Sequence, residues 1–170
     1  FLHRAGAGVF VSVRDGRPFP IPLNFVYDEA REAVYLHTGK GGRSRSNLEE
    51  GAEARGEPVP VSGAPVALSL YEMGRLLPAD EALEFGVEYA SVVVFGQGKV
   101  VEDPAEAEAA LTLLMEKYAP HLKAGQDYRP VTIEEIRRTT VMRLDIEGWS
   151  GKEKTEVPDF PGAYRLEEVR

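Results

Sequence analysis

Short apolar strands joined by very short turns are the feature of this sequence that most constrains its fold. Residues 9–13 are β-branched and apolar and lead into Asp15-Gly16, a dipeptide that tolerates positive φ at both turn positions. The return strand, 20–27, contains two prolines that cannot donate to a ladder, so we expect it at a sheet edge. A second short turn leads to a strand over 33–37. Connections this short join antiparallel neighbours, so these three strands are predicted to form an antiparallel meander.

Further strands are predicted where apolar residues alternate with others, at 66–70, 89–101 and 141–149. Gly96 and Gly98 favour a bulge or a close approach to the backbone. The ambiguous stretch 73–87 is interpreted as a long hairpin excursion. About six strands without βαβ alternation favour a closed barrel or a sandwich, so we expect one mainly β domain over 1–170.

Two helices are predicted from capping signals. Asp103 precedes a proline, Glu106 stands at capping-box spacing, and an apolar stripe follows to Tyr118. Thr132 and Glu135 predict a shorter helix by the same box. One or two helical turns are also expected over 47–51, with the terminal glycine as C-cap.

Composition excludes several kinds of site. The chain of 170 residues has no cysteine, which rules out disulfides, thiolate catalysis and Cys-ligated metals. Its three histidines lie far apart, so we expect no metal site. A net charge of −8 makes nucleic acid an unfavourable partner. No apolar run is as long as a membrane span and no secretory signal is seen at the start, so a cytoplasmic protein is expected.

The glycine-rich, basic segment 38–46 is the strongest candidate for ligand binding. Lys40, Arg43, Ser44 and Arg45 offer cations and a hydroxyl near a helix start, and neighbouring glycines let the backbone approach a ligand. A phosphate group is stabilised by such cations, by free backbone N–H groups and by the helix dipole. A solvated, flexible basic loop would have the same composition, so the residues alone leave both interpretations open.

Four short segments resemble one family when taken in order. They are Pro22-Leu23-Asn24-Phe25, then Tyr35-Leu36-His37-Thr38-Gly39 with Gly42-Arg43-Ser44, then 91–96 before the Asp103-Pro104 helix, and finally Trp149-Ser150-Gly151-Lys152. From about Gly8 to Lys152 the chain resembles the FMN-binding split barrels of pyridoxamine-phosphate-oxidase-like proteins, and it looks most similar to their nitroimidazole-resistance branch. It departs from that pattern in a longer region, 51–64, and in Ser44, where a second basic residue is usual.

The resemblance implies a fold and a set of site residues. The fold is a six-stranded antiparallel split barrel of Greek-key type with a few short helices, its core at about 8–152 and a tail at 153–170. His37, near the flavin, is implied to be catalytic. The implied cofactor-binding residues are Leu23, Asn24, Phe25, His37, Thr38, Gly39, Lys40, Arg43, Ser44, Arg45, Val92, Val93, Val94 and Trp149, the last one also a candidate dimer-interface anchor.

The resemblance also implies an activity and a partner. We expect an FMN-dependent oxidoreductase that acts on a small molecule, with a nitroaromatic or similar acceptor as a candidate substrate. Such barrels usually form homodimers in which both subunits enclose each cofactor. The alternatives are a flavin-binding carrier or sensor without turnover, and a barrel that binds heme or the deazaflavin F420 in place of FMN.

Overall fold

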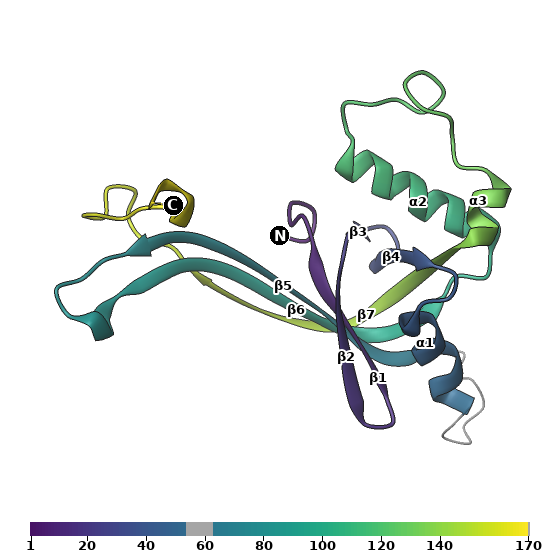
Figure 1. Ribbon diagram of the computed structural model, residues 1–170, viewed down its shortest axis with the longest axis horizontal. Coiled ribbons are helices and arrows are strands. Elements are labelled where there is room, and N and C mark those ends of the chain that lie inside the picture. The colour runs from purple at the N-terminus through teal and green to yellow at the C-terminus, as the bar shows by residue number, and fades with distance from the viewer. Residues whose placement is uncertain (54–62, 170) are drawn as a thin grey trace.

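One antiparallel sheet of seven strands dominates the computed structural model, which describes residues 1–53 and 63–169 (Figure 1). The strands are β1 (Gly8–Arg14), β2 (Arg17–Leu23), β3 (Phe25–Asp28), β4 (Ala33–Gly39), β5 (Ala64–Leu77), β6 (Gly86–Val100) and β7 (Thr139–Lys154). The helices are α1 (Arg43–Glu53), α2 (Pro104–Tyr118) and α3 (Ile133–Arg138), with 3₁₀ turns η1 (Ala82–Glu84) and η2 (Leu166–Val169).

The sheet is open, so the expected six-stranded closed barrel is wrong in strand number and closure, while the mainly β, antiparallel class is confirmed. Its strand order is β2-β1-β5-β6-β7-β4-β3. The predicted strand 20–27 is in fact two strands, broken at Asn24, that lie at opposite edges of the sheet. The edges therefore meet only where the chain passes through Asn24, and no ladder joins β2 to β3.

The two hairpins of the predicted meander are confirmed, but the meander itself is not. β1 pairs with β2 across a turn in which Asp15 and Gly16 have φ of 52° and 72°. β3 pairs with β4, and β4 continues onto β7 rather than back towards β2. As predicted, the prolines confine β2 to an edge, because they cannot donate hydrogen bonds to a strand on its second side.

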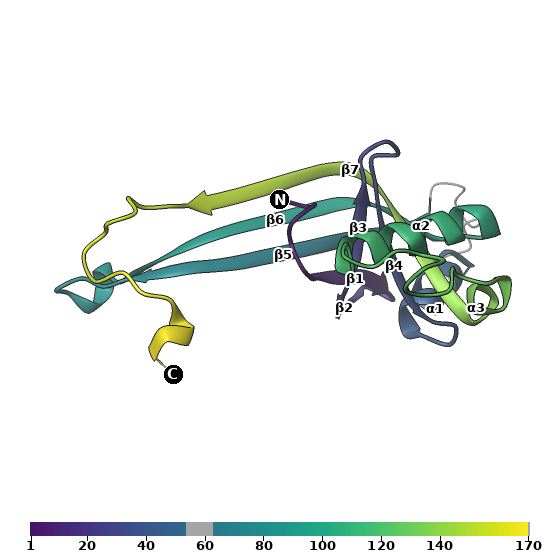
Figure 2. The same ribbon diagram turned by 90° about the horizontal axis from the view of Figure 1, so that it is seen from above.

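Two apolar clusters hold the fold together. The larger fills the concave side of the sheet with fully buried side chains that include Phe10, Leu36, Leu68 and Met142. The smaller lies on the other face of β3, β4 and β7, where α2 and α3 cover it with residues such as Leu114 (Figures 1 and 2). Tyr35 and Leu36 belong to different clusters because successive strand residues point to opposite faces.

Strands β5, β6 and β7 continue far beyond the rest of the sheet as an arm (Figures 1 and 2). We define the arm as residues 69–77, 86–93 and 150–154. The excursion predicted at 73–87 is confirmed as its hairpin end. The bulge predicted near Gly96 is also confirmed, because the ladder between β6 and β7 shifts register between Phe95 and Gly96.

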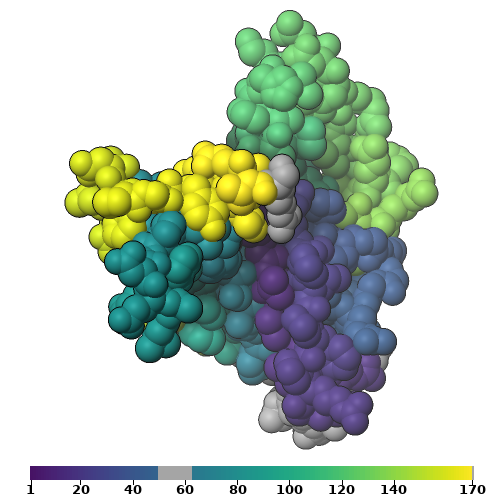
Figure 3. All heavy atoms as spheres, turned by 60° about the vertical axis from the view of Figure 1, so that its left-hand side comes forward, coloured from purple at the N-terminus to yellow at the C-terminus, as the bar shows by residue number. Residues whose placement is uncertain are grey.

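The C-terminal segment folds back onto the arm and is not a free tail. Leu76 and Tyr164 form an isolated bridge, with backbone hydrogen bonds of 2.7 and 3.2 Å. Arg75 donates to the carbonyls of Val157 and Pro158 at 3.0 and 2.7 Å. In Figure 3 the yellow C-terminal segment lies over the teal strands accordingly.

The helix predictions hold in part. Asp103 caps α2 by accepting from the Ala105 N–H at 3.0 Å, and the capping box at the start of α3 is present. α1 begins at Arg43 rather than Asn47 and continues through Gly51, so the predicted C-cap is wrong. The start moves because the Gly42 carbonyl already accepts from the first-turn N–H of Arg45 at 3.1 Å. Most of the region 51–64, in which the chain departs from the family pattern, lies outside the described residues.

Candidate functional site

A hollow of about 300 Å³ opens where the two sheet edges meet. Its lining is Ala7, Pro22, Leu23, Asn24 and His37. Three of the predicted cofactor-binding residues, Leu23, Asn24 and His37, are thus brought together from β2, the β2–β3 break and β4. Ala7 also lines this hollow but was not among the predicted residues, because it lies in the segment before the first strand, where no motif was found.

The free edge of β2 offers carbonyls but few donors, and Asn24 is the exception. Residues beside a two-residue hairpin turn form a hydrogen-bonded pair, so Arg17 and every second residue after it bond to β1. The alternate residues, Pro18, Pro20 and Pro22, face away from β1 without an N–H. Asn24 is the next residue in that series, and no hydrogen bond of its N–H is found in the described part of the chain. Its amide is the first donor along this edge.

Phe25 has no free backbone group to offer a ligand, unlike Asn24 before it. Its N–H donates to the Tyr118 hydroxyl at 3.0 Å, and its carbonyl accepts from Lys117 Nζ at 2.9 Å. The Lys117 ammonium also lies 3.6 Å from the centre of the Phe25 ring. Desolvation by burial lowers the pKa of Lys117 to about 8. The last turn of α2 therefore positions β3. The sequence did not indicate this role, because Lys117 and Tyr118 belong to the pattern of an amphipathic helix.

The cations of the basic loop point in different directions. Arg43 is exposed and places its guanidinium 5.1 Å from the ring centre of Phe19 on β2. Arg45 is bonded through Nε to both oxygens of Glu49 at 2.9 Å, and through Nη2 at 2.8 Å. Its charge is therefore already compensated, which leaves Arg43 and the exposed Lys40 as the loop cations without an ion pair in the described residues.

The remaining loop residues shape the start of α1. Gly42 N donates to the Gly39 carbonyl at 3.3 Å, and the Thr38 hydroxyl donates to the same carbonyl at 3.2 Å. Ser44 is buried in the first turn of the helix. First-turn N–H groups of an α-helix have no carbonyl four residues back, so Arg43 and Ser44 present theirs outward.

The predicted residues of β6 and β7 lie elsewhere in the chain. Val92, Val94 and Trp149 line a separate hollow of about 610 Å³, together with His3, Tyr27 and three glutamates. Val93 faces the opposite side of the sheet, since it alternates with its neighbours. Trp149 is 72% exposed. One chain by itself thus does not bring these residues to His37 and the basic loop.

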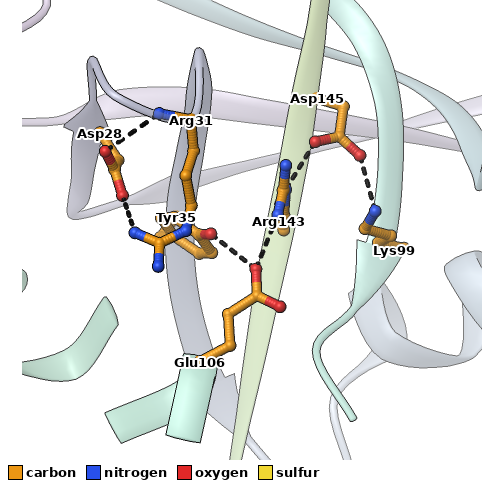
Figure 4. A network of polar contacts seen from close by, with 7 residues as sticks. All are labelled: Asp28, Arg31, Tyr35, Lys99, Glu106, Arg143 and Asp145. Carbon is orange, nitrogen blue, oxygen red and sulfur yellow. Dashed lines mark hydrogen bonds and ion pairs between the residues drawn. The ribbon is translucent and has the colours of Figure 1, made fainter. Parts of the chain in front are cut away.

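A polar network fixes β4, the strand that carries His37. Tyr35 of β4 donates to Glu106 of α2 at 2.6 Å, and Arg143 of β7 donates to the same oxygen at 2.9 Å (Figure 4). Arg143 also bonds Asp145, which pairs with Lys99 of β6 at 2.8 Å. Burial raises the pKa of Glu106, but the hydrogen bonds from Tyr35 and Arg143 outweigh it and hold that pKa below its usual range. Glu106 serves this network and not the predicted capping box.

Within the described ranges, the structure has neither a metal-binding cluster nor a membrane-spanning helix. Among residues 1–53 and 63–169, no three His, Asp or Glu side chains gather in a group that could hold a metal ion. No helix in those ranges has the length and apolarity needed to cross a membrane.

The curved antiparallel sheet, split between β2 and β3 at the hollow, defines a split-barrel protein. The sequence model described as pyridoxamine 5'-phosphate oxidase matches residues 1–153. The chain therefore belongs to the pyridoxamine 5'-phosphate oxidase family, as its sequence motifs implied. A comparison with curated proteins finds no match.

Solved structures with the same fold include three informative relatives. The FAD- and heme-binding protein of Mycobacterium smegmatis is 25% identical, with a TM-score of 0.73 over 93% of this chain and 70% of that one. A flavocytochrome of Azotobacter vinelandii is 24% identical, with a TM-score of 0.72 over 91% of this chain, which spans only 64% of that protein. A protein of Bacteroides thetaiotaomicron named for 5-nitroimidazole antibiotic resistance is 18% identical, with a TM-score of 0.65 over 88% of this chain and 77% of that one.

Proposed function

We propose that this protein is a flavin-dependent oxidoreductase that binds FMN between the basic loop and the hollow at the β2–β3 break. The observation that carries the proposal is the position of Arg43 over Phe19, on the same strand whose other end lines that hollow. Phe19 and Leu23 are separated by about 13 Å of strand at roughly 3.3 Å per residue. A cation at one end and a lined hollow at the other suit a ligand with a phosphate at one end and a flat ring system at the other.

The phosphate end is assigned to Arg43 and Ser44. Arg43 can donate two parallel hydrogen bonds to phosphate oxygens. The outward N–H groups in the first turn of α1 and the helix dipole favour an anion at the same place. Arg45, bonded to Glu49, is given at most an indirect share.

The ring end is assigned to Leu23 as part of the lining, to the backbone of Asn24 and to His37. The Asn24 N–H is a donor for a carbonyl of the ring, and the carbonyls of the free β2 edge are acceptors for a ring N–H. When bound, the flavin supplies the hydride and electron transfer that no side chain here can supply. His37 lines the same hollow, where an imidazole can hydrogen-bond and orient a substrate.

We further propose that a second copy of the chain completes each site. The arm and its base carry exposed aromatic and apolar side chains, among them Tyr71 at 59% on the arm and Phe95 at 51% at its base. Such a contiguous apolar face is typical of an interface. Trp149, exposed at the base of the arm, would then stack on or beside the flavin of the partner subunit, which one chain cannot arrange.

The test is the absorption spectrum of the purified protein, before and after FMN is added and the protein is desalted. Retained flavin bands near one FMN per chain, followed by bleaching with NADH or NADPH and recovery with a nitroaromatic acceptor, are expected. Retained FMN that neither donor reduces would favour a carrier or sensor without turnover. A protein that returns colourless from desalting contradicts the FMN site, and a single deazaflavin band would replace FMN by F420.

Heme is the second candidate, and one observation favours it. His3 lines the hollow of about 610 Å³, whose other walls include Leu2, Val92, Ile146 and Trp149. An imidazole beside a large apolar space is what heme iron requires of a protein ligand. Three glutamates line the same hollow and repel heme propionates, so flavin stays the first proposal. A Soret band in the spectrum, abolished by His3→Ala, would reverse that order.

A further inference from the structure

A third hollow, of about 270 Å³, borders the basic loop. It is enclosed by the loop before α1, the end of β6, the start of α2, α3 and the start of β7. Its volume accommodates several water molecules at about 30 Å³ each, and hence a group of phosphate or diphosphate size. None of its lining residues belongs to the hollow that holds Asn24 and His37.

Three cations line this hollow against a single carboxylate. Lys40 and Arg45 come from the loop and α1, Arg137 comes from α3, and the carboxylate is Glu102. Arg45 is bonded to Glu49, but Lys40 and Arg137 form no ion pair among residues 1–53 and 63–169. In a chain whose net charge is −8, two exposed and uncompensated cations on segments about 100 residues apart converge on one concavity.

The rest of the wall of this hollow is apolar, with Val101, Ile133 and Ile136. Val101 and Ile136 also pack against the smaller apolar cluster. The site thus combines cations with room for a short apolar body.

We propose that this hollow is a second anion site, which binds the phosphate or diphosphate group of a small molecule independently of Arg43. Arg137 and Lys40 hold the charge, and the apolar wall contacts the part of the ligand that adjoins the phosphate. Two sources share this chemistry: the second phosphate of a flavin longer than FMN, whose first phosphate stays at Arg43, and a separate phosphorylated compound bound beside the flavin.

The test is calorimetric titration of inorganic pyrophosphate into FMN-saturated protein at fixed ionic strength. Wild-type protein is expected to bind it, and Arg137→Glu should weaken binding at least tenfold, since a charge-assisted hydrogen bond is lost and a repulsion is added. Arg138→Glu is the matched control, because this exposed neighbour makes the same charge change outside the hollow. Arg43→Ala should weaken FMN binding and leave pyrophosphate binding in place.

The variants and ligands of this experiment distinguish this site from the flavin site, and one source of the phosphate from the other. FAD binding that falls with Arg137→Glu while FMN binding does not identifies the second phosphate of the longer flavin. Unchanged FAD binding with Arg137-dependent pyrophosphate binding identifies a separate compound. No pyrophosphate binding, or equal loss in Arg137→Glu and Arg138→Glu, overturns the proposal. Arg137-dependent pyrophosphate binding in a chain that retains no FMN would sink the proposed function but not this site.

Discussion

Asn24 occupies the single position between the two edge strands, and its role there is carried by the backbone. Its side chain is exposed, whereas its N–H is the first donor along an edge from which three prolines remove the others. Phe25, one residue later, has both backbone groups bonded to the last turn of α2. Adjacent residues that look alike in the family motif therefore differ in what they can offer a ligand.

Asn24→Pro tests the backbone donor. It removes the N–H, and it suits a position preceded by a strand residue, since Leu23 already has the extended conformation that a following proline requires. FMN binding, measured by the quenching of flavin fluorescence, should weaken about tenfold, because one hydrogen bond to the flavin is lost. Asn24→Ala, which keeps the N–H, should bind like the wild type. Equal losses in the two variants would show that the side chain matters and the backbone does not.

Arg43→Ala and Arg45→Ala form a second matched pair at this scale. Removing Arg43 should weaken FMN binding by about 1–3 kcal/mol, the usual worth of a charged hydrogen bond. Removing Arg45 should change it little, because Glu49 already holds that guanidinium. Both are measured by the same fluorescence titration. A larger loss for Arg45→Ala than for Arg43→Ala contradicts the assignment.

At the scale of elements, two polar clusters join segments that the chain order separates. One is the network of Tyr35, Glu106 and Arg143, which ties β4 to α2 and β7 (Figure 4). The other is the pair of Arg75 and Glu88, which holds the C-terminal segment against the arm. Each cluster satisfies its partly buried charges with several hydrogen bonds, and such pairs are costly to break on one side only.

Tyr35→Phe tests the first cluster. The ring keeps its packing against the smaller apolar cluster, but Glu106 loses one of its two hydrogen-bond donors. We expect the free energy of unfolding to fall by about 1–2 kcal/mol, measured by urea denaturation. Thr112→Val on α2, whose hydroxyl donates to the Glu108 carbonyl of its own helix and takes no part in the network, serves as the control. A change no larger than that of the control would mean that the network does not stabilise β4.

Acidification tests the second cluster. The hydrogen bonds from Arg75 lower the pKa of Glu88 from its ordinary value of 4.5 to about 2. A depressed carboxyl pKa gives stability that is fully present above pH 4.5 and is lost as the pH falls towards 2. The protection factor of the Glu156 N–H, which donates to Glu88, should therefore stay high at pH 5 and fall near pH 2; this factor compares its exchange rate with that of an unstructured amide at the same pH. In Glu88→Gln the protection should be low at both pH values, and high protection in that variant would rule out the pair as the anchor.

At the scale of the whole molecule, the arm leaves an apolar face of the sheet without cover. On it Tyr71 and Tyr89 stack with ring centres 6.4 Å apart, and Phe95 stands at its base. The residues predicted to surround a flavin are divided among separate hollows of one chain. The proposed second copy, seated on the arm, would account for both observations.

Phe95→Glu is expected to abolish the dimer. A charge placed in the centre of a desolvated interface is strongly unfavourable, so the variant should have the mass of a single chain by light scattering and should retain less FMN. Leu122→Glu makes the same kind of change at an exposed apolar residue between α2 and α3, away from the arm. A dimer that survives Phe95→Glu, or a wild-type chain that is monomeric, contradicts the proposal.

The sequence by itself determined the features that depend on near neighbours. The Asp15-Gly16 turn, the Asp103 cap, the capping box at Thr132 and the edge position of β2 each follow from the conformational preferences of a few consecutive residues. Family motifs added the antiparallel split-barrel class and pointed to Asn24 and His37, which the structure does place in one hollow.

Only the tertiary structure decided which segments meet. The break at Asn24 sends β2 and β3 to opposite edges, because each pairs with a strand far from the other in space. The structure also shows that Arg45 is ion-paired with Glu49 while Arg43 is not. Contacts between distant segments bond Phe25 to Lys117 and place Glu106 in a network with Arg143. Charge pairing and burial depend on the full set of neighbours, so local patterns could name these residues but not assign their partners.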